Sequence, residues 1–314
     1  MTHDDERFGL TVGPVLYWWP RPALLQFYAD LADTAVDTVV LGETVCSRRH
    51  EMKPDDWFAL ARDLQAAGKQ VVLATQVLVE SESDLRLLRR LAEQTDALVE
   101  AGDASALQVL SRGGRPFVIG PHVNVYSRPA LVEHARFGAV RWVAPAELSI
   151  DAVGRVNPAA DPVRTVHEGQ APIETEVFAF GRLPLAFSAR CFTARHHRLS
   201  KDQCDFRCRD DADGLALDTE DGRPFLVLNG IQTQSAAQHC LIGEREALRA
   251  AGVRRLRLSP CSRDFAAVLQ RFEAVFNRGA DRDEARAAIE ALQLPGGLAN
   301  GYAHRRPGLD WTRS

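Results

Sequence analysis

Short apolar segments alternate with amphipathic segments through the first half of this 314-residue chain. The apolar segments, such as 38–41, 70–79 and 139–143, have the length of β-strands, and helical periodicity follows the first two of these. Parallel strands covered on both faces are continuously apolar and are joined by helices. Because this unit repeats at least five times, we predict an α/β fold with a TIM-barrel-like (β/α) barrel rather than an open sheet.

The alternation breaks after about residue 150 and returns near the C-terminus. Two β-type runs, at 174–180 and 184–189, are separated by Gly181-Arg-Leu, and a polar, irregular stretch follows at 191–223. We therefore expect a single domain over residues 1–314 that carries a β-rich excursion and an inserted Cys-rich loop. Its predicted parts are barrel strands and helices at about 8–150 and 224–277, a cysteine-loop insertion at about 172–223, and a surface tail at about 294–314.

Charge and hydropathy exclude several classes of function. The chain has 38 Lys and Arg against 42 Asp and Glu, a net charge of −4, which argues against broad nucleic-acid binding. The acidic N-terminus does not resemble a signal peptide, and no apolar run could span a bilayer, so we expect a cytoplasmic protein without a transmembrane segment. In that reducing compartment the six cysteines are not expected to form disulfides, which leaves metal binding or core packing.

Three cysteines fall within one irregular segment, with the spacing C-x12-C-x3-C at Cys191, Cys204 and Cys208. Thiolates are soft ligands that suit zinc or iron–sulfur clusters. C-x3-C is not the C-x2-C spacing favoured by structural zinc, so an iron–sulfur cluster is favoured. The neighbouring His196-His197 pair is an alternative source of ligands.

A fourth thiolate must come from Cys46, Cys240 or Cys261. Cys46 follows the second predicted strand, and Arg48 and Arg49 beside it are expected to lower its pKa. Cys240 lies in an apolar stretch typical of core packing. Cys261 follows a late strand and could either pack or reach the same barrel face.

Functional loops of a (β/α) barrel follow the carboxyl ends of its strands. Polar residues at or near such ends include Glu43, Gln76, His122 and Glu147. Glu43, His122, Glu147 and Glu176 are candidate acid–base groups of the barrel mouth. For each of them alone, structural pairing is the stronger expectation.

The stretch from Glu176 to Cys191, EVFAFGRLPLAFSARC, resembles the signature region of the collagenase-like peptidase family, whose catalytic type is unassigned. Within that family the chain most resembles the UbiV-like branch of ubiquinone biosynthesis. The closer resemblance rests on GRLPLAFSARCFTAR at 181–195, on the cysteines that follow it, and on LGETVCSRR at 41–49.

The resemblance implies a barrel and a [4Fe-4S] cluster held by Cys46, Cys191, Cys204 and Cys208. It also implies a heterodimer with a UbiU-like sister protein, acting as an oxygen-independent hydroxylation system for the ubiquinone precursor. A prephenate-like oxygen donor and a lipid-carrier accessory protein would complete that system. Four arginines flank the ligand cysteines: Arg48, Arg49, Arg190 and Arg195. They either stabilise the anionic cluster or are solvated and paired with local carboxylates.

The chain departs from the family where peptidase-like members carry His and Cys, because Phe180 and Pro184 stand there. It also has no H-E-x-x-H or G-x-S-x-G motif, so peptidase activity is not expected. We expect a subunit of a hydroxylase in which a fully thiolate-ligated cluster transfers electrons. The alternatives are a non-catalytic iron–sulfur scaffold for the partner, and an RNA base hydroxylation factor, which the negative net charge disfavours.

Overall fold

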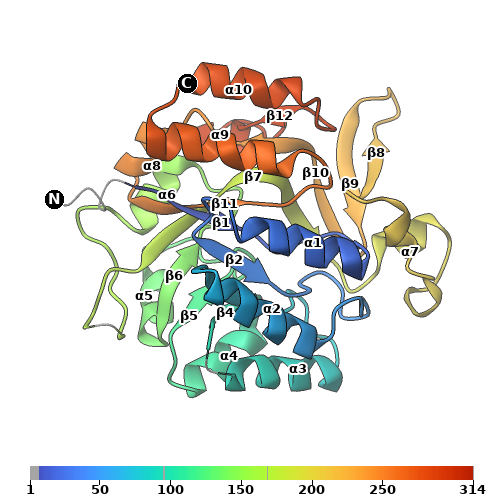
Figure 1. The fold of residues 1–314 in the computed structure, drawn as a ribbon, viewed down its shortest axis with the longest axis horizontal. Coiled ribbons are helices and arrows are strands. Elements are labelled where there is room, and N and C mark those ends of the chain that lie inside the picture. Colours follow the sequence, from blue (N-terminus) through green and yellow to red (C-terminus); the bar gives the residue numbers. More distant parts are fainter. Residues whose placement is uncertain (1–6, 95, 168, 314) are drawn as a thin grey trace.

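A computed structural model describes residues 7–94, 96–167 and 169–313 and contains a closed barrel of eight parallel strands (Figure 1). β11 pairs with both β7 and β1 and so closes the ring. The strands, in their order around the barrel, are β1 (Gly9–Val12), β2 (Thr38–Leu41), β3 (Gln70–Ala74), β4 (Leu98–Ala101), β5 (Phe117–Ile119), β6 (Ala139–Val143), β7 (Glu174–Phe187) and β11 (Val253–Leu258). The predicted TIM-barrel-like fold is confirmed.

Helices cover the outside of the barrel (Figure 1). They are α1 (Arg21–Leu31), α2 (Pro54–Ala66), α3 (Glu82–Glu93), α4 (Ala104–Arg112), α5 (Arg128–Arg136), α6 (Ile150–Val156), α8 (Arg245–Ala250), α9 (Phe265–Arg278) and α10 (Arg282–Ala291). Side-chain oxygens cap the start of several helices by accepting a backbone N–H of the first turn, as Ser81, Asp103 and Ser127 do. No helix among the described residues has the length and hydropathy needed to cross a membrane.

β7 is one strand of 14 residues and not the two runs expected from the sequence. Its first half lies in the barrel, and its second half extends beyond the mouth and pairs antiparallel with β10 (Gln232–Cys240). Gly181, at the point of exit, has a φ of +118°, and a Cβ there would lie 2.6 Å from the Cβ of Ser259. The glycine that looked like a break is a bend that only glycine adopts readily.

The excursion beyond the barrel is a small antiparallel sheet. β10 pairs with β9 (Pro224–Asn229), and β9 pairs with β8 (Leu215–Asp218). The expectation that the barrel resumes at about residue 224 therefore differs from the structure, in which it resumes at β11. An apolar run such as 224–229 is equally typical of a barrel strand and of a strand in a small antiparallel sheet, so its sequence does not distinguish the two.

The cysteine-rich segment joins β7 to β8 and lies at the right of Figure 1. It contains the short helix α7 (Phe192–His196) and the 3-10 turns η2 (Lys201–Gln203) and η3 (Arg207–Asp210). Lys201 Nζ lies 2.7 Å from Glu80 Oε1, and Asp213 Oδ1 accepts the backbone N–H of Ser262 at 2.8 Å. These contacts hold the segment against loops at the carboxyl ends of the barrel strands.

The C-terminal tail packs along the excursion. β12 (Leu298–Ala299) pairs with β10, and η4 (Gly301–His304) follows it. Asn300 is buried and exchanges two hydrogen bonds with the backbone of Thr312, at 2.8 and 2.7 Å.

Candidate functional site

The mouth of the barrel, where the strand ends meet, is nearly filled. The remaining cavity measures about 30 Å³ and has room for little more than water. Its lining comes from most of the strand ends and includes Thr44, Thr75, His122, Pro184 and Ser259. Because Pro184 belongs to the extension of β7, the chain's own strand covers the place where barrel enzymes usually hold a substrate.

Charged side chains occupy the inside of the barrel below this cavity. Arg257 Nε donates to Glu176 Oε1 at 2.6 Å, and its Nη1 donates to Glu100 Oε1 at 3.0 Å. Arg141 donates from Nε to Glu174 Oε2 at 2.9 Å and lies 3.6 Å from Glu176. Burial alone would raise the pKa of Glu176, but Arg257 and Arg141 hold it below the usual value. Glu176 is thus an ion-paired carboxylate of the barrel wall.

Sequence reasoning did not identify Glu100, Arg141 or Arg257. A signal was present for Glu100 and Arg141, because each is the single charge of an otherwise apolar strand, as in AVRWV for Arg141, whereas Arg257 is one of three arginines in VRRLRL. Charges at such positions face the barrel interior or its helix layer, and both places require a buried partner.

His122 and Glu147 line a second cavity of about 220 Å³ beside the covered mouth. The His122 ring packs against Phe187, with ring centroids 4.7 Å apart. Burial, reinforced by the charge of Arg257, lowers the pKa of His122 to about 3, so its ring is neutral at physiological pH. Glu147 accepts a hydrogen bond from the Tyr126 hydroxyl.

Glu43 shapes the loop that carries Cys46. Its Oε1 accepts the backbone N–H of Val45 at 2.8 Å and that of Cys46 at 3.0 Å. Burial raises the pKa of Glu43, while Arg49, 3.8 Å away, opposes that rise. These two hydrogen bonds hold the backbone of the loop at Cys46. Glu43 therefore helps to position Cys46.

Arg49 lies at the centre of the cysteine site and is buried. Its Nη1 donates to the Leu16 carbonyl and its Nη2 to Asn229 Oδ1, both at 2.8 Å. Its charge acts on the thiols of both Cys46 and Cys208. Arg49 therefore connects the loop after β2, the loop after β1 and the excursion at one point.

Two of the predicted ligands, Cys46 and Cys208, interact with this guanidinium, and Cys191 lies near both thiols. Burial raises the pKa of the Cys46 and Cys208 thiols, Arg49 opposes the rise, and the nearby Cys191 adds to it. The expectation that flanking arginines lower the pKa of Cys46 is therefore wrong, because desolvation outweighs their charge. Cys191 begins α7, where its Sγ accepts the backbone N–H of Ala194 at 3.4 Å.

Cys204 lies half-buried at the end of η2, in the same segment. Arg48 anchors this part of the loop, since its Nη2 donates to the Asp202 carbonyl at 3.0 Å and its guanidinium lies 5.9 Å from the Phe206 ring centre. All six cysteines are free thiols. Within the described ranges, no three or more His, Cys, Asp or Glu side chains are arranged as a metal site.

The other predicted residues are either exposed or buried in the core. Arg190 and Arg195 are exposed, Arg190 before α7 and Arg195 within it. Cys240 and Cys261 are both buried, and burial raises the pKa of each to about 12. The Cys261 thiol donates to the Arg263 carbonyl at 3.2 Å.

A family model described as peptidase family U32 matches residues 25–313. The chain belongs to peptidase family U32. In this U32 chain Phe180 is fully buried in the core and packs edge-on against Phe272, and Pro184 lines the covered mouth. Neither position offers an acid, a base or a nucleophile.

Two solved structures of low sequence identity are similar to this U32 chain over most of its length. The phospho-2-dehydro-3-deoxyheptonate aldolase of Thermotoga maritima is 12% identical over 94% of this chain and 72% of its own, with a TM-score of 0.44. An O-GlcNAc hydrolase of Thermobaculum terrenum is 11% identical over 91% of this chain and 63% of its own, with a TM-score of 0.45.

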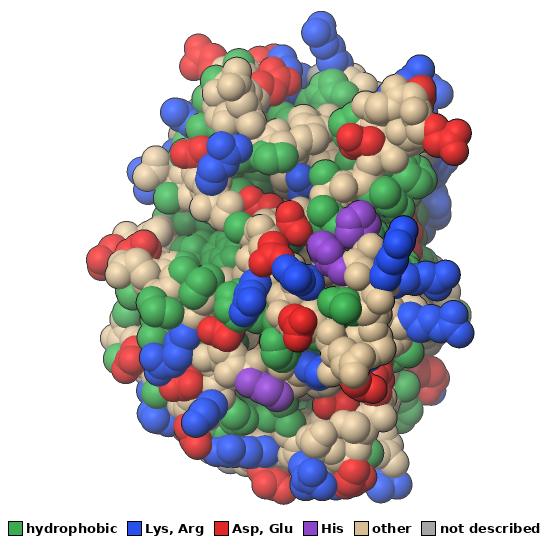
Figure 2. Space-filling model, turned by 90° about the vertical axis from the view of Figure 1, so that its right-hand side faces the viewer, with side chains coloured by type: hydrophobic (Ala, Val, Ile, Leu, Met, Phe, Trp, Pro, Cys, Tyr) green, Lys and Arg blue, Asp and Glu red, His purple; other side chains and the backbone are tan. Residues whose placement is uncertain are grey.

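The face that carries the cysteine segment, drawn toward the viewer in Figure 2, intersperses positive and negative side chains. It shows no continuous basic surface of the kind that follows a nucleic-acid backbone.

Proposed function

We propose that this U32 chain holds a [4Fe-4S] cluster through Cys46, Cys191, Cys204 and Cys208. In this proposal it is the iron–sulfur subunit of an oxygen-independent hydroxylation system in ubiquinone biosynthesis. The observation that carries the proposal is the gathering of thiols from two distant loops around Arg49. Family membership and the sequence resemblance supply the reaction class.

The donor set fits the group in its chemistry. Iron–sulfur clusters take thiolate ligands, and a buried cation beside them offsets the negative charge of the cluster. Since burial raises the pKa of Cys46 and Cys208, these thiols are protonated at neutral pH before a metal binds, and binding releases their protons. When bound, such a cluster supplies one-electron transfer.

The chain's own residues hold the ligand loops in place. Glu43 fixes the loop of Cys46 through two backbone hydrogen bonds, and Arg48 holds the turn before Cys204. Arg49 lies between the two loops and cannot lose its charge, which makes it a permanent counter-charge for thiolates. These residues position the ligands and need not touch the substrate.

The partners in this proposal follow from the resemblance. They are a UbiU-like sister protein, a lipid-carrier accessory protein that presents the ubiquinone precursor, and a prephenate-like oxygen donor. We place the chain in the cytoplasm, where reducing conditions keep thiols available.

One observation favours a second candidate, a non-catalytic scaffold that supports the partner. The barrel mouth is covered by the chain's own β7, and ion pairs fill the barrel interior below it. In that case the cluster only stabilises the fold of this chain, and the chemistry takes place in the partner.

Anaerobic purification followed by metal analysis tests the proposal. We expect a brown protein with about four irons per chain, as a cubane cluster requires. Cys46→Ala should abolish the cluster, whereas the matched control Cys240→Ala should retain it, because Cys240 is a buried packing residue. A colourless protein, or iron retained in Cys46→Ala, would contradict the ligand assignment.

Reconstitution with the partner separates the two candidates. If the redox role holds, a folded but cluster-free variant supports no hydroxylation. Full hydroxylation by that variant would establish the scaffold role instead.

A further inference from the structure

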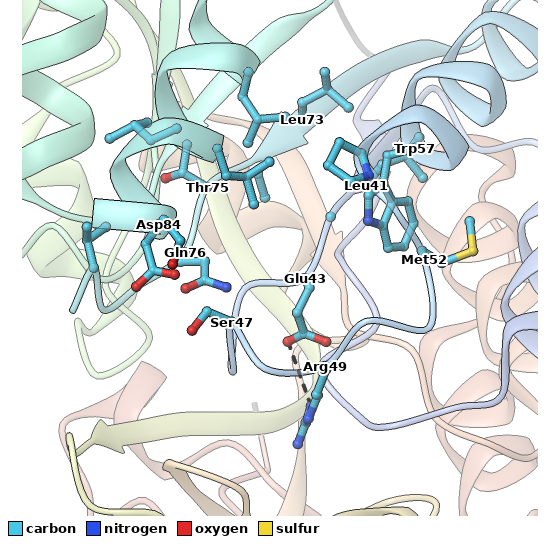
Figure 3. Close-up of a pocket in the computed structure, with 18 of the residues that line it drawn as sticks. Leu41, Glu43, Ser47, Arg49, Met52, Trp57, Leu73, Thr75, Gln76 and Asp84 are labelled. Carbon is cyan, nitrogen blue, oxygen red and sulfur yellow. Dashed lines mark ion pairs between the residues drawn. The ribbon is translucent and has the colours of Figure 1, made fainter. Parts of the chain in front are cut away.

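Arg49 is buried beside the cysteine site, and one of its N–H groups has no acceptor. Its Nη1 and Nη2 donate to Leu16 and Asn229, and it forms an ion pair of 3.8 Å with Glu43 (Figure 3). Its Nε is also buried, but it makes no hydrogen bond within the described part of the chain. A buried N–H group without an acceptor costs free energy. The position of Arg49 therefore indicates an acceptor that these residues do not supply.

Asn229 holds the guanidinium in this orientation. Its Nδ2 donates to the Leu16 carbonyl at 2.8 Å and to Gln232 Oε1 at 3.1 Å, and its Oδ1 accepts from Arg49. An amide nitrogen has two hydrogens, and both are engaged here, so Asn229 is fixed with its oxygen toward the arginine. The buried Nε2 of Gln232 is a second donor without a partner among the described residues. Two unsatisfied donors thus belong to one hydrogen-bond network.

The turn between β9 and β10, residues 229–232, also contacts the start of α7. The Gly230 carbonyl accepts the Phe192 N–H at 2.7 Å, and the Thr193 hydroxyl accepts the Gly230 N–H at 2.9 Å. Gly230 has a φ of +63°, and a Cβ there would lie 3.0 Å from Arg49 Nη2. One tight turn therefore joins Arg49 to the two residues that follow a predicted ligand cysteine.

Sulfur is the acceptor that the surroundings of Arg49 can provide. The charge of Arg49 acts on Cys46 and Cys208, and Cys191 lies near both thiols. Hydrogen bonds to the sulfurs of an iron–sulfur cluster change its reduction potential. An N–H donor favours the more negative, reduced state, so such a bond raises the potential. A cluster held by these cysteines would bring sulfur to the buried Nε.

We propose that the turn of residues 229–232 sets the reduction potential of the cluster, by holding Arg49 so that its Nε–H donates to a sulfur of the cluster or of its ligands. Asn229 acts through Arg49 and is a positioning residue. The inference rests on the proposed function, because it requires the cluster, and it adds what regulates electron transfer at that site.

Potentiometric titration of the anaerobically purified full chain tests the proposal. Dithionite is the one-electron reductant, and electron paramagnetic resonance detects the reduced cluster. Arg49→Lys keeps the positive charge but removes the Nε–H, and Asn229→Leu keeps Arg49 but removes the group that orients it. In both variants we expect unchanged iron content and an equilibrium constant for reduction that falls about tenfold, which is ~59 mV for one electron.

The matched controls are buried residues whose hydrogen bonds go to other parts of the fold. Arg182→Lys replaces a second buried arginine of the excursion. Asn157→Leu replaces a buried asparagine that donates to Ile173 and Thr175 and accepts from Val163. Both controls should lower the free energy of unfolding and keep the wild-type potential.

The outcomes separate this inference from the proposed function. A fall in potential in each site variant that retains iron, with unchanged controls, supports the inference. A wild-type chain that takes up no iron overturns both. Iron in the wild type overturns this inference alone if a site variant that retains iron keeps the wild-type potential, if both site variants lose iron, or if a control shows an equal fall.

Discussion

Arg257 lies inside the barrel, where branched apolar side chains usually dominate. Its ion pairs with Glu100 and Glu176 are almost free of solvent. Glu100 stands out in the sequence as the single charge of its strand, but its pairing with Arg257 could not be predicted, because it depends on which strand positions share a layer of the barrel. The same holds for Arg49, whose partners come from loops far apart in the chain.

Replacing Arg257 should destabilise the fold strongly. Arg257→Leu leaves two buried carboxylates without their main cation, and breaking such a pair costs about 3–5 kcal/mol. Urea unfolding measures this loss in the free energy of unfolding. The exposed Arg112→Leu on α4 is the control and should stay within about 0.5 kcal/mol of wild type. A loss under about 1 kcal/mol for Arg257→Leu would show that the network is not stabilising.

The lowered pKa of Glu176 predicts a pH dependence of stability. A carboxyl whose pKa is lower in the folded state stabilises the fold above its unfolded pKa, and the stabilisation is lost as the pH falls through the folded value. The free energy of unfolding should therefore drop from about pH 5 downward. In Glu176→Gln the drop should be shallower, and parallel curves for the two proteins would contradict this origin.

At the level of elements, the sequence predicted the strands that are continuously apolar. β2 and β6 lie where the apolar runs indicated. β10 was not predicted, because its sequence, QTQSAAQHC, is polar, although the strand is largely buried in the structure. Its glutamines face other parts of the chain, and such tertiary burial overrides local propensity.

Gly181→Ala tests the bend at which β7 leaves the barrel. The positive φ and the close approach of Ser259 predict a loss of about 1–3 kcal/mol in the free energy of unfolding. Gly113→Ala is a matched control, since Gly113 has an ordinary helical φ of −70°. Thermal unfolding of both variants measures the difference, and equal melting temperatures would rule out strain at Gly181.

For the whole molecule, resemblance named the four cysteines, but only the fold shows that two distant loops bring Cys46 and Cys208 to one arginine. Neither the raised pKa of Cys46 nor the network that joins Arg49 to the turn at 229–232 is visible in the sequence. Both depend on which groups the complete tertiary structure buries together.

The C-terminal tail should contribute to global stability through Asn300. Asn300→Ala removes both hydrogen bonds to Thr312 at a buried position, and we expect a loss of about 1–3 kcal/mol. Amide hydrogen exchange should become faster in residues 298–313. Leu309→Ala, at an exposed position of the same tail, is the control and should change neither quantity. Unchanged exchange in Asn300→Ala would show that these two hydrogen bonds do not hold the tail in place.

The continuity of β7 has a consequence for how this architecture can diversify. One strand, about 45 Å long at the usual rise per residue, forms part of the barrel wall and then pairs with the antiparallel sheet of the excursion. The chain returns to the barrel through β11, beside the same strand. We expect that loops of the excursion can lengthen or shorten without shifting the register of the barrel. The segment that carries most of the thiols is thus built outside the ring of barrel strands.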